Sequence, residues 1–198
     1  MSKLISGKEI SNEINQAVKD KIAALTEEKG FPPKLFSFTN RESQDAKIYA
    51  NMQKRIAEFV GIEFVSKEIA PNVTEKELLL EIEKANIDNT VTAIIIQKPL
   101  PEGINHDSIV AKIKPEKDAE GIHPYNLGKI FRRDADIVPC TPGAIMKILD
   151  FHNIDLYGKE VVIVGHSDIV GKPLSVMMLN ENATISVCHI ETSKKGNL

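Results

Sequence analysis

Apolar side chains recur at helical spacing in three segments of the first half of the chain. Helices are expected from 10 to 25, from about 43 to 60 and from 75 to 85, and glycines follow the first two. The second of these helices has an apolar stripe made of Ile48, Met52, Ile56 and Phe59. Short apolar runs of strand type lie at 35–38, 63–69 and 92–97. This alternation of helices and strands is typical of an α/β sheet.

A second α/β pattern begins near residues 140 to 150. Before it, the tract from 98 to 142 is less regular and holds six of the ten prolines. After it, a helix is expected at 144–152, a strand at 160–165, a helix at 171–179 and a strand at 183–189. We therefore expect two domains, 1–142 and 143–198. The second domain has two strands where such a sheet usually has four to six.

Composition favours a reduced, cytoplasmic protein. The 198 residues are 42% hydrophobic and carry a net charge of −3, which gives no basic excess for nucleic acid or a membrane surface. Neither a signal peptide nor an apolar run long enough to cross a membrane is recognised. The two cysteines form no disulfide framework and have no zinc-site spacing, so no metal is predicted.

Two loops carry candidate ligand-binding residues. In VVIVGHSDIVGKPLS, a strand ends at Gly165 and a helix begins near Gly171, an arrangement that suits a pyrophosphate at a helix N-terminus. The spacing is not the usual G-x-G-x-x-G, so a plain strand-to-helix turn stays an alternative. Gln97 lies at the carboxyl end of a buried strand, where α/β sheets bind ligands, although a proline-rich crossover loop would look the same.

The proline-bounded tract from 115 to 142 holds further polar candidates. Asp118, Glu120 and His123 could be imagined as a metal site, but a solvated acidic turn is the more common origin of such a cluster. Cys140 is interpreted as a packing thiol rather than a nucleophile, because no histidine is tied to it by sequence. Thr141 is expected to cap the following helix, with Pro142 as its first residue.

Taken together and in order, these segments resemble the bifunctional methylenetetrahydrofolate dehydrogenase/methenyltetrahydrofolate cyclohydrolase family. The resemblance runs from residue 5 to the last residue. It rests on ISGKEI, Tyr49 with the glycine at 61, QKPLP, KDAEGIHPYNLG, PCTP, GHSDIVGKP and VCH. It implies an N-terminal α/β folate-binding domain followed by a truncated Rossmann-like NAD(P)-binding domain, with folate held in a cleft between them.

The resemblance also implies roles for individual residues. Tyr49 and the residue four positions later flank the reacting end of the folate, Gln97 tunes that second residue, and a carboxylate at position 120 holds the pterin. Catalytic roles therefore fall on Tyr49, Gln53 and Gln97. Substrate contacts fall on Tyr49, Gln97, Pro99, Leu100 and Glu120.

Two of these positions depart from the family pattern. Gln53 stands where the family has a lysine, and Glu120 replaces an aspartate with a side chain one methylene longer. Lys54 is no substitute for that lysine, because at about 100° per residue it points about 140° away from Tyr49. Glutamine cannot transfer protons near neutral pH. Lys98 is a candidate for a relocated amine, but a solvated loop lysine is the commoner case.

The cofactor side departs as well. The resemblance assigns dinucleotide binding to Gly165, His166, Ser167, Val170, Gly171 and Ile190. His166 and Ile190 stand where NADP-using members have an arginine and a serine, and Glu191 follows. A carboxylate near the ribose 2′ position repels phosphate, so NAD is expected in preference to NADP.

The leading hypothesis is an enzyme of one-carbon folate metabolism, with tetrahydrofolate as the substrate scaffold. It would oxidise 5,10-methylenetetrahydrofolate with NAD(P), whereas hydrolysis to 10-formyltetrahydrofolate is in doubt because of Gln53. The alternative is a catalytically impaired homologue that binds folate or acts as an interaction partner. An unrelated NAD-binding protein is a third hypothesis. A homodimer is expected if the second domain folds, and either a longer chain or a partner would cover the open sheet edge.

Overall fold

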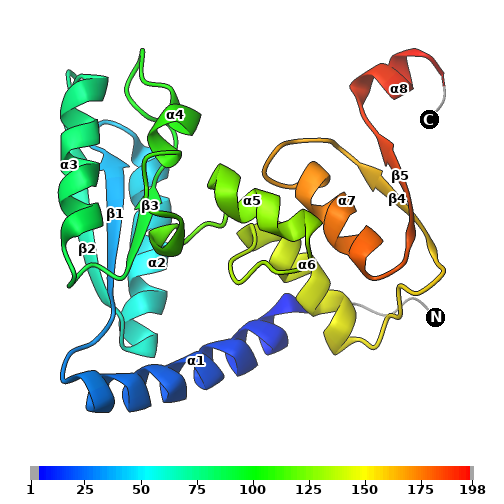
Figure 1. Ribbon diagram of the computed structural model, residues 1–198, viewed down its shortest axis with the longest axis horizontal. Helices are drawn as coiled ribbons and strands as arrows, with labels where there is room; N and C mark the ends of the chain where they lie inside the picture. The colour runs from blue at the N-terminus through cyan, green and yellow to red at the C-terminus, as the bar shows by residue number, and fades with distance from the viewer. Residues whose placement is uncertain (1–4, 197–198) are drawn as a thin grey trace. The chain divides into compact units, whose positions relative to one another are not determined.

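The computed structural model describes residues 5–196 and divides the chain into two compact units. The first unit ends at Ala119 and the second begins at Glu120. The α/β architecture expected from the sequence is confirmed in both units (Figure 1). None of the helices in the described part of the chain is both long and apolar enough to cross a membrane.

Unit 1 is built on a three-stranded parallel sheet in the order β2-β1-β3. Its strands are β1 (Lys34–Asn40), β2 (Glu63–Ile69) and β3 (Ala93–Ile96). The central strand pairs Lys34 with Glu63 on one side and Leu35 with Ala93 on the other. Because all three strands are parallel, their carboxyl ends meet at one edge, the usual place for a ligand in such sheets.

Three long helices belong to this unit, and their ends follow local sequence signals. They are α1 (Gly7–Lys29), α2 (Gln44–Val60) and α3 (Glu75–Ile87). The second and third connect the strands, whereas the first precedes β1. Ser43 caps α2 by accepting a hydrogen bond from the backbone N–H of Ala46, and Thr74 forms a capping box with Glu77 at α3. Left-handed glycines end α1 and α2, as the sequence predicts.

The apolar stripe of α2 is not the face that packs on the sheet. Ile48, Met52, Ile56 and Phe59 are all about half exposed, whereas Ala46, Ala50, Ala57 and Val60 are buried. The small alanine side chains let the helix backbone approach the strands closely. Helix α2 therefore has two apolar faces, and the one with the larger side chains is about half exposed, with Lys19 Nζ lying 4.7 Å from the centroid of the Phe59 ring.

The irregular tract contains short helical elements. In unit 1 these are α4 (His106–Val110) and the 3-10 helix η1 (Pro115–Lys117). Unit 2 then begins with α5 (Pro124–Phe131), which the sequence did not predict. His123 caps α5 by accepting a hydrogen bond from the backbone N–H of Tyr125 through Nδ1.

Unit 2 contains a parallel two-stranded sheet and three further helices. They are α6 (Cys140–Phe151), β4 (Glu160–Val164), α7 (Gly171–Asn180), β5 (Thr184–Cys188) and α8 (Ile190–Lys194). The core of this unit consists of Leu156, Ile163, Leu174, Met178 and Ala183. The opposite side of β4 exposes Val162 and Val164, which are 62% and 74% exposed.

Three expectations at the start of α6 are wrong. The N-cap is Pro139, not Thr141, and the helix begins at Cys140, so that Pro142 is the third helical residue. The first four backbone N–H groups of a helix have no partner within it, so a proline at this position loses no helical hydrogen bond. Cys140 is exposed and therefore is not a packing thiol.

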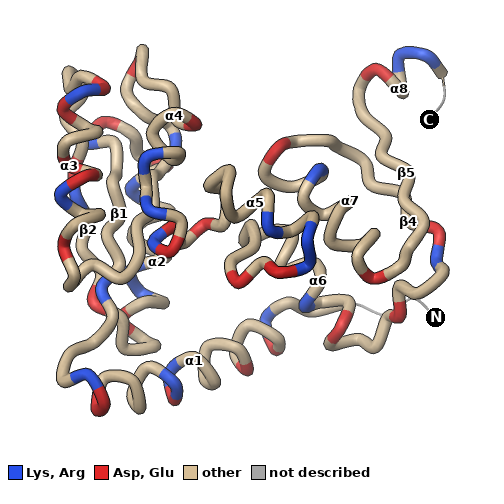
Figure 2. The backbone as a smooth tube through the Cα atoms, in the orientation of Figure 1, with Lys and Arg blue, Asp and Glu red and all other residues tan. Residues whose placement is uncertain are grey.

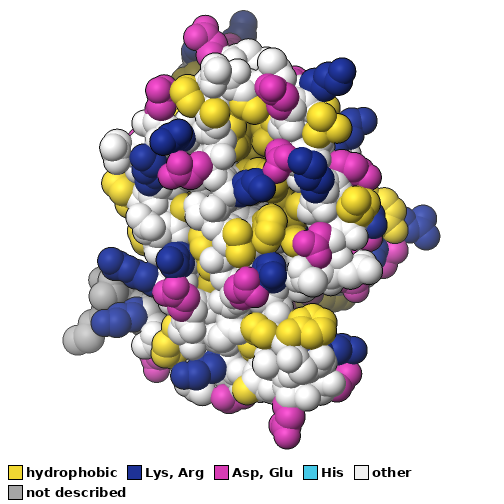
Figure 3. Space-filling view, turned by 90° about the vertical axis from the view of Figure 1, so that its left-hand side faces the viewer, with side chains coloured by type: hydrophobic (Ala, Val, Ile, Leu, Met, Phe, Trp, Pro, Cys, Tyr) yellow, Lys and Arg dark blue, Asp and Glu magenta, His cyan; other side chains and the backbone are white. Residues whose placement is uncertain are grey.

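The surface carries charges of both signs. Acidic and basic residues alternate along α1 and α3 (Figure 2). On the side shown in Figure 3, hydrophobic side chains gather along the middle of the face and charged residues of both signs surround them. The mixture of acidic and basic residues agrees with the net charge of −3, in which there is no basic excess.

Lys117 joins η1 to the carboxyl end of α3. Its Nζ donates hydrogen bonds to the backbone oxygens of Ala85, Asn86 and Asp88 at 2.9, 2.8 and 2.8 Å. The last carbonyls of a helix have no partner within it, and a cation there also interacts favourably with the helix dipole. One ammonium group thus satisfies three carbonyls and fixes the segment that leads to Asp118.

Replacing Lys117 by methionine should lower the free energy of unfolding by about 1–3 kcal/mol, because partly buried carbonyls lose charged donors. Urea denaturation of the full chain measures this change. Lys112→Met is the matched control, since Lys112 is exposed and its side chain makes no hydrogen bond or ion pair among the described residues. Equal stability losses in the two variants would contradict the proposed role of the three bonds.

Candidate active site

Helix α2 and strand β3 meet through two glutamine side chains. Gln97, the residue after β3, donates a hydrogen bond from Nε2 to Oε1 of Gln53 at 2.6 Å. The same nitrogen donates to Oγ of Ser37 on β1 at 3.0 Å. One amide group therefore connects the helix to the carboxyl edge of the sheet.

This contact lies in a largely buried polar cluster, of which Gln53 is the half-buried member. Gln97, Ser37 and Thr39 are all buried, and the Ser37 and Thr39 hydroxyls are 3.3 Å apart. Both Nε2 protons of Gln97 are used. Among the described residues, no hydrogen bond uses Gln97 Oε1 or Gln53 Nε2, which leaves one acceptor and one donor for a ligand.

Tyr49 and Lys54 follow the expected helix geometry. Tyr49 is 61% exposed, one turn before Gln53. Lys54 lies 3.7 Å from Glu58 as an exposed i,i+4 ion pair and does not take part in the glutamine contact. The amine nearest to Gln53 in sequence is thus directed to another partner.

The loop after β3 is fixed from the neighbouring strand. Asn40, at the end of β1, donates from Nδ2 to the backbone oxygen of Pro99 at 3.2 Å, and the Lys98–Pro99 peptide bond is cis. Pro99 is exposed and Leu100 is half-buried. Lys98 is exposed on this loop. Asn40, Ser37 and Thr39 were not predicted as site residues, and the only signal for them is the polar alternation within an otherwise apolar strand.

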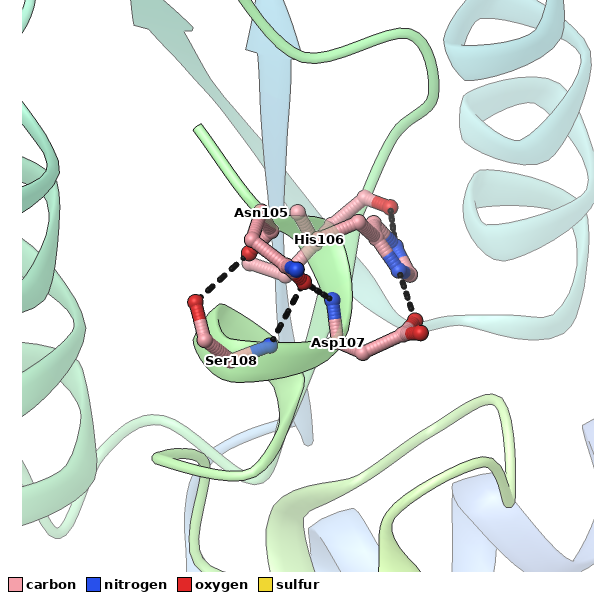
Figure 4. Close-up of polar contacts among 5 residues, drawn as sticks. Asn105, His106, Asp107 and Ser108 are labelled. Atoms are coloured by element: carbon pink, nitrogen blue, oxygen red, sulfur yellow. Dashed lines mark hydrogen bonds and ion pairs between the residues drawn. The ribbon is translucent and has the colours of Figure 1, made fainter. Parts of the chain in front are cut away.

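His106, the first residue of α4, is a further half-buried group near this loop. Its Nε2 lies 3.4 Å from the backbone oxygen of Ile96 and its Nδ1 lies 3.3 Å from Asp107 (Figure 4). Asn105 caps the same helix by accepting hydrogen bonds from the backbone N–H groups of Asp107 and Ser108. Burial, with the positive charge of Lys98 as a second cause, lowers the pKa of His106 below its ordinary value.

Glu120 is the first residue of unit 2. Its backbone oxygen accepts a hydrogen bond from Sγ of Cys140 at 3.8 Å. The next residue, Gly121, has φ +71°, and a Cβ there would lie 2.3 Å from the backbone carbon of Val138. A side chain cannot be accommodated, so the glycine holds the Glu120 segment against the residues before α6. No group of three or more potential metal ligands occurs within residues 5–196.

The turn between β4 and α7 has the close packing that a dinucleotide site needs. A Cβ on Gly171 would lie 2.1 Å from the backbone oxygen of Gly165, which itself has φ +120°. No side chain caps α7, whose N-cap is Val170, and Ser167 lies in the exposed turn before it. The backbone N–H groups of Val170 and Lys172 donate to the Ser167 oxygen, and Pro173 has none. The close glycine turn and the positive end of the helix dipole still suit a pyrophosphate, so these residues fit an NAD(P) cofactor.

The carboxyl end of β5 completes this region. His189 caps α8 by accepting a hydrogen bond from the backbone N–H of Glu191 at 3.3 Å. Ile190 is 64% exposed. Glu191 forms an ion pair with Lys194 at 2.6 Å. The helix α8 was not predicted from the sequence.

Comparison with known proteins decides the family. The model of the catalytic domain of tetrahydrofolate dehydrogenase/cyclohydrolase matches residues 5–120, and the model of its NAD(P)-binding domain matches residues 139–198. The chain belongs to the tetrahydrofolate dehydrogenase/cyclohydrolase family. It is 39% identical over 191 residues to the bifunctional protein FolD of Methanosarcina barkeri, an alignment that covers 96% of this chain and 67% of the relative.

Solved structures of the family have the same fold. The bifunctional FolD enzyme of Campylobacter jejuni is similar with a TM-score of 0.92 and 37% identity, covering 96% of this chain and 67% of that chain. The Trypanosoma brucei FolD structure, solved with NADP and an inhibitor, gives a TM-score of 0.88 and 32% identity over 95% of this chain and 64% of that one. This chain thus contains the family's catalytic domain and a short NAD(P)-binding domain.

The lowered pKa of His106 predicts a pH-dependent loss of stability. As the pH falls through the ordinary histidine range near 6.5, the unfolded chain takes up a proton before the folded chain does, so folding weakens. His106→Gln should lose less stability than the wild type between pH 7.5 and 5, measured by urea denaturation at each pH. NMR titration of the imidazole is the second readout. Parallel pH profiles for the two proteins would contradict the effect.

Proposed function

We propose that this chain oxidises 5,10-methylenetetrahydrofolate to the methenyl compound and hydrolyses that product poorly. Membership in the family supports the substrate and the reaction class. The observation that carries the finer proposal is the hydrogen bond between Gln53 and Gln97, since two amides occupy the position where the resemblance implies a lysine and its glutamine partner.

The oxidation needs no proton transfer to or from a side chain. A bound NAD(P) supplies the hydride acceptor, and the hydride leaves the methylene carbon of the folate. The task of the protein is then to bind and orient the substrate. In this proposal Gln53 Nε2 donates to the folate, Gln97 Oε1 accepts from it, Tyr49 contacts its reacting end and Pro99 and Leu100 line its binding loop.

The hydrolysis has different requirements. Water adds to the methenyl carbon and must lose a proton, after which a carbon–nitrogen bond breaks and the nitrogen takes up a proton. A positioned general base or acid contributes typically 10²–10⁴-fold to such a step. A glutamine side chain can neither remove nor supply that proton near neutral pH, so the second step is expected to be slow.

Glu120 and the coenzyme residues complete the proposal. The carboxylate of Glu120 would accept hydrogen bonds from the pterin, with one more methylene than the aspartate of the family pattern. Gly165, His166, Ser167, Val170, Gly171 and Ile190 would hold the dinucleotide. The Glu191 carboxylate favours NAD over NADP at the ribose. A homodimer through the second unit remains part of this proposal.

The second candidate function is a folate-binding homologue without catalysis, or an interaction partner. The exposed stripe of Ile48, Met52, Ile56 and Phe59 favours it, because a large apolar helix face is a frequent contact surface for another chain. Separate assays of dinucleotide-dependent oxidation and of methenyltetrahydrofolate hydrolysis distinguish the two. Tetrahydrofolate binding with neither activity would overturn the enzymatic proposal.

Gln53→Lys should raise the hydrolysis rate by about 10²-fold or more and change the oxidation rate only a few-fold. The new amine would lie one turn after Tyr49. After rotation of the Gln97 amide, Gln97 Oε1 could accept hydrogen bonds from this amine and from the Ser37 hydroxyl. Gln53→Met is the control, since it matches the side-chain length but supplies no base. Equal hydrolysis rates in the wild type and in Gln53→Lys would contradict the assignment.

Lys98→Ala tests the relocated amine. If the missing lysine is not replaced, this variant should leave the low hydrolysis rate of the wild type unchanged within about twofold, because Lys98 is an exposed loop residue. The measurement is the decay of methenyltetrahydrofolate absorbance. A loss of ten-fold or more would assign the proton transfer to Lys98 and overturn our account of Gln53.

A further inference from the structure

A polar cavity lies between helix α2 and the first two strands of unit 1. Its volume is 310 Å³, and the residues that line it include Thr39, Arg41, Lys47, Asn51 and Glu68. Thr39 is buried, whereas the charged residues from the ends of the two strands are exposed, so the cavity is open to solvent. Small-molecule sites have volumes of about 300–1,000 Å³, and this cavity therefore has room for a small ligand.

This cavity is separate from the candidate active site. In the strand order β2-β1-β3, Gln97 follows β3 on one side of β1, whereas the cavity lies on the β2 side. At about 100° per residue, Lys47 lies about 160° around α2 from Tyr49. A ligand in the cavity would thus contact the side of α2 that is turned away from Tyr49.

Positive charge in the cavity is only partly neutralised. Arg41 Nε lies 3.5 Å from Glu68, but no hydrogen bond or ion pair within residues 5–196 engages the two terminal nitrogens of the Arg41 guanidinium group. Lys47 is half-buried, and its Nζ makes no hydrogen bond or ion pair with any described residue. A guanidinium fork together with an ammonium group is the arrangement that binds phosphate and carboxylate groups.

Thr39 connects the cavity to the buried amide of Gln97. The Thr39 hydroxyl oxygen lies 3.3 Å from Ser37 Oγ, which accepts a hydrogen bond from Gln97 Nε2 at 3.0 Å. If an anion accepts the Thr39 proton, Ser37 donates to Thr39, and every hydrogen bond in the chain then runs from Gln97 toward the cavity. Hydrogen bonds in such a chain polarise and strengthen one another. An anion therefore favours the orientation in which the Gln97 amide donates to Ser37 and to Gln53.

We propose that this cavity binds a small oxyanion, the phosphate or carboxylate group of a small molecule, and that the bound anion holds Gln97 in its donating orientation. Lys47 and the terminal nitrogens of Arg41 bind the negative charge, while the Asn51 amide and the Thr39 hydroxyl donate further hydrogen bonds. The cavity is thus an effector site that acts on the candidate active site. Anion binding does not depend on whether the chain catalyses oxidation or hydrolysis of folates.

Titration of inorganic phosphate into the nitrogen-15-labelled full chain, followed by NMR at pH 7.5, tests the site directly. Sodium chloride keeps the ionic strength constant. Backbone amide signals from 39–51 should shift with a single midpoint, and the side-chain amide protons of Gln97 should shift with the same midpoint. A parallel titration with sodium succinate distinguishes the two sources of the anion. A response to one probe alone assigns that class of ligand, a response to both assigns oxyanions in general, and a response to neither overturns the proposal.

Variants of the charged residues test the contacts. Lys47→Met should weaken phosphate binding about tenfold, and Glu68→Gln should strengthen it about two- to fivefold, because a repelling carboxylate that also holds Arg41 is removed. Lys54→Met is the matched control and should bind within about twofold of the wild type. Lys54 lies two turns further along the same face of α2, is paired with Glu58 and does not line the cavity. Equal affinities in Lys47→Met and the wild type would overturn the site.

Thr39→Val separates anion binding from its effect on Gln97. This variant should still bind phosphate, at most about threefold more weakly, because the charged contacts remain. The Gln97 side-chain signals should no longer respond, because valine interrupts the chain of hydroxyl groups. The same Gln97 response in Thr39→Val as in the wild type would overturn the hydrogen-bonded route.

Discussion

The amide group of Gln97 is the point at which the candidate site is held together. Its single nitrogen has two protons, and both have acceptors: Gln53 on α2 and Ser37 on β1. Because the side chain is buried, leaving either proton without a partner would cost about 1–3 kcal/mol. The rotamer of Gln97 is therefore fixed by two separate elements, and the loop from Lys98 onward starts from a fixed position.

The secondary structure was largely predictable because local signals and tertiary contacts agree. Helix ends at Gly30 and Gly61 follow from the left-handed conformation that ends a helix, and apolar runs such as 93–96 form strands, in this case an edge strand paired with β1. The orientation of α2 was not predictable in the same way. Its large apolar residues and its alanines both recur at helical spacing, and only close packing on the sheet selects the alanine face.

The site was predictable where one residue carries a distinct chemical role and not where it depends on contacts distant in sequence. Gln97 and the Gly165 turn follow from their positions at strand ends. Ser37 and Thr39 alternate with apolar residues, a pattern that also suits an exposed strand, and Asn40 follows Thr39 directly at the strand end. The contact between Gly121 and Val138 is invisible in the sequence, because the spacing of the two residues has no regular period. The short α8 lacks enough residues for a periodic signal.

Family membership and reaction chemistry rest on different parts of the molecule. The strands, caps and glycines that make this chain a family member require no proton-transferring side chain, so replacing a lysine with Gln53 leaves the fold unaffected. The amide–amide bond satisfies the buried Gln97 as well as an amine would, but with polarity reversed: Gln97 donates where it would otherwise accept. A glutamine at this position thus satisfies the hydrogen bonding of the buried Gln97, and its amide supplies no proton-transferring group of its own.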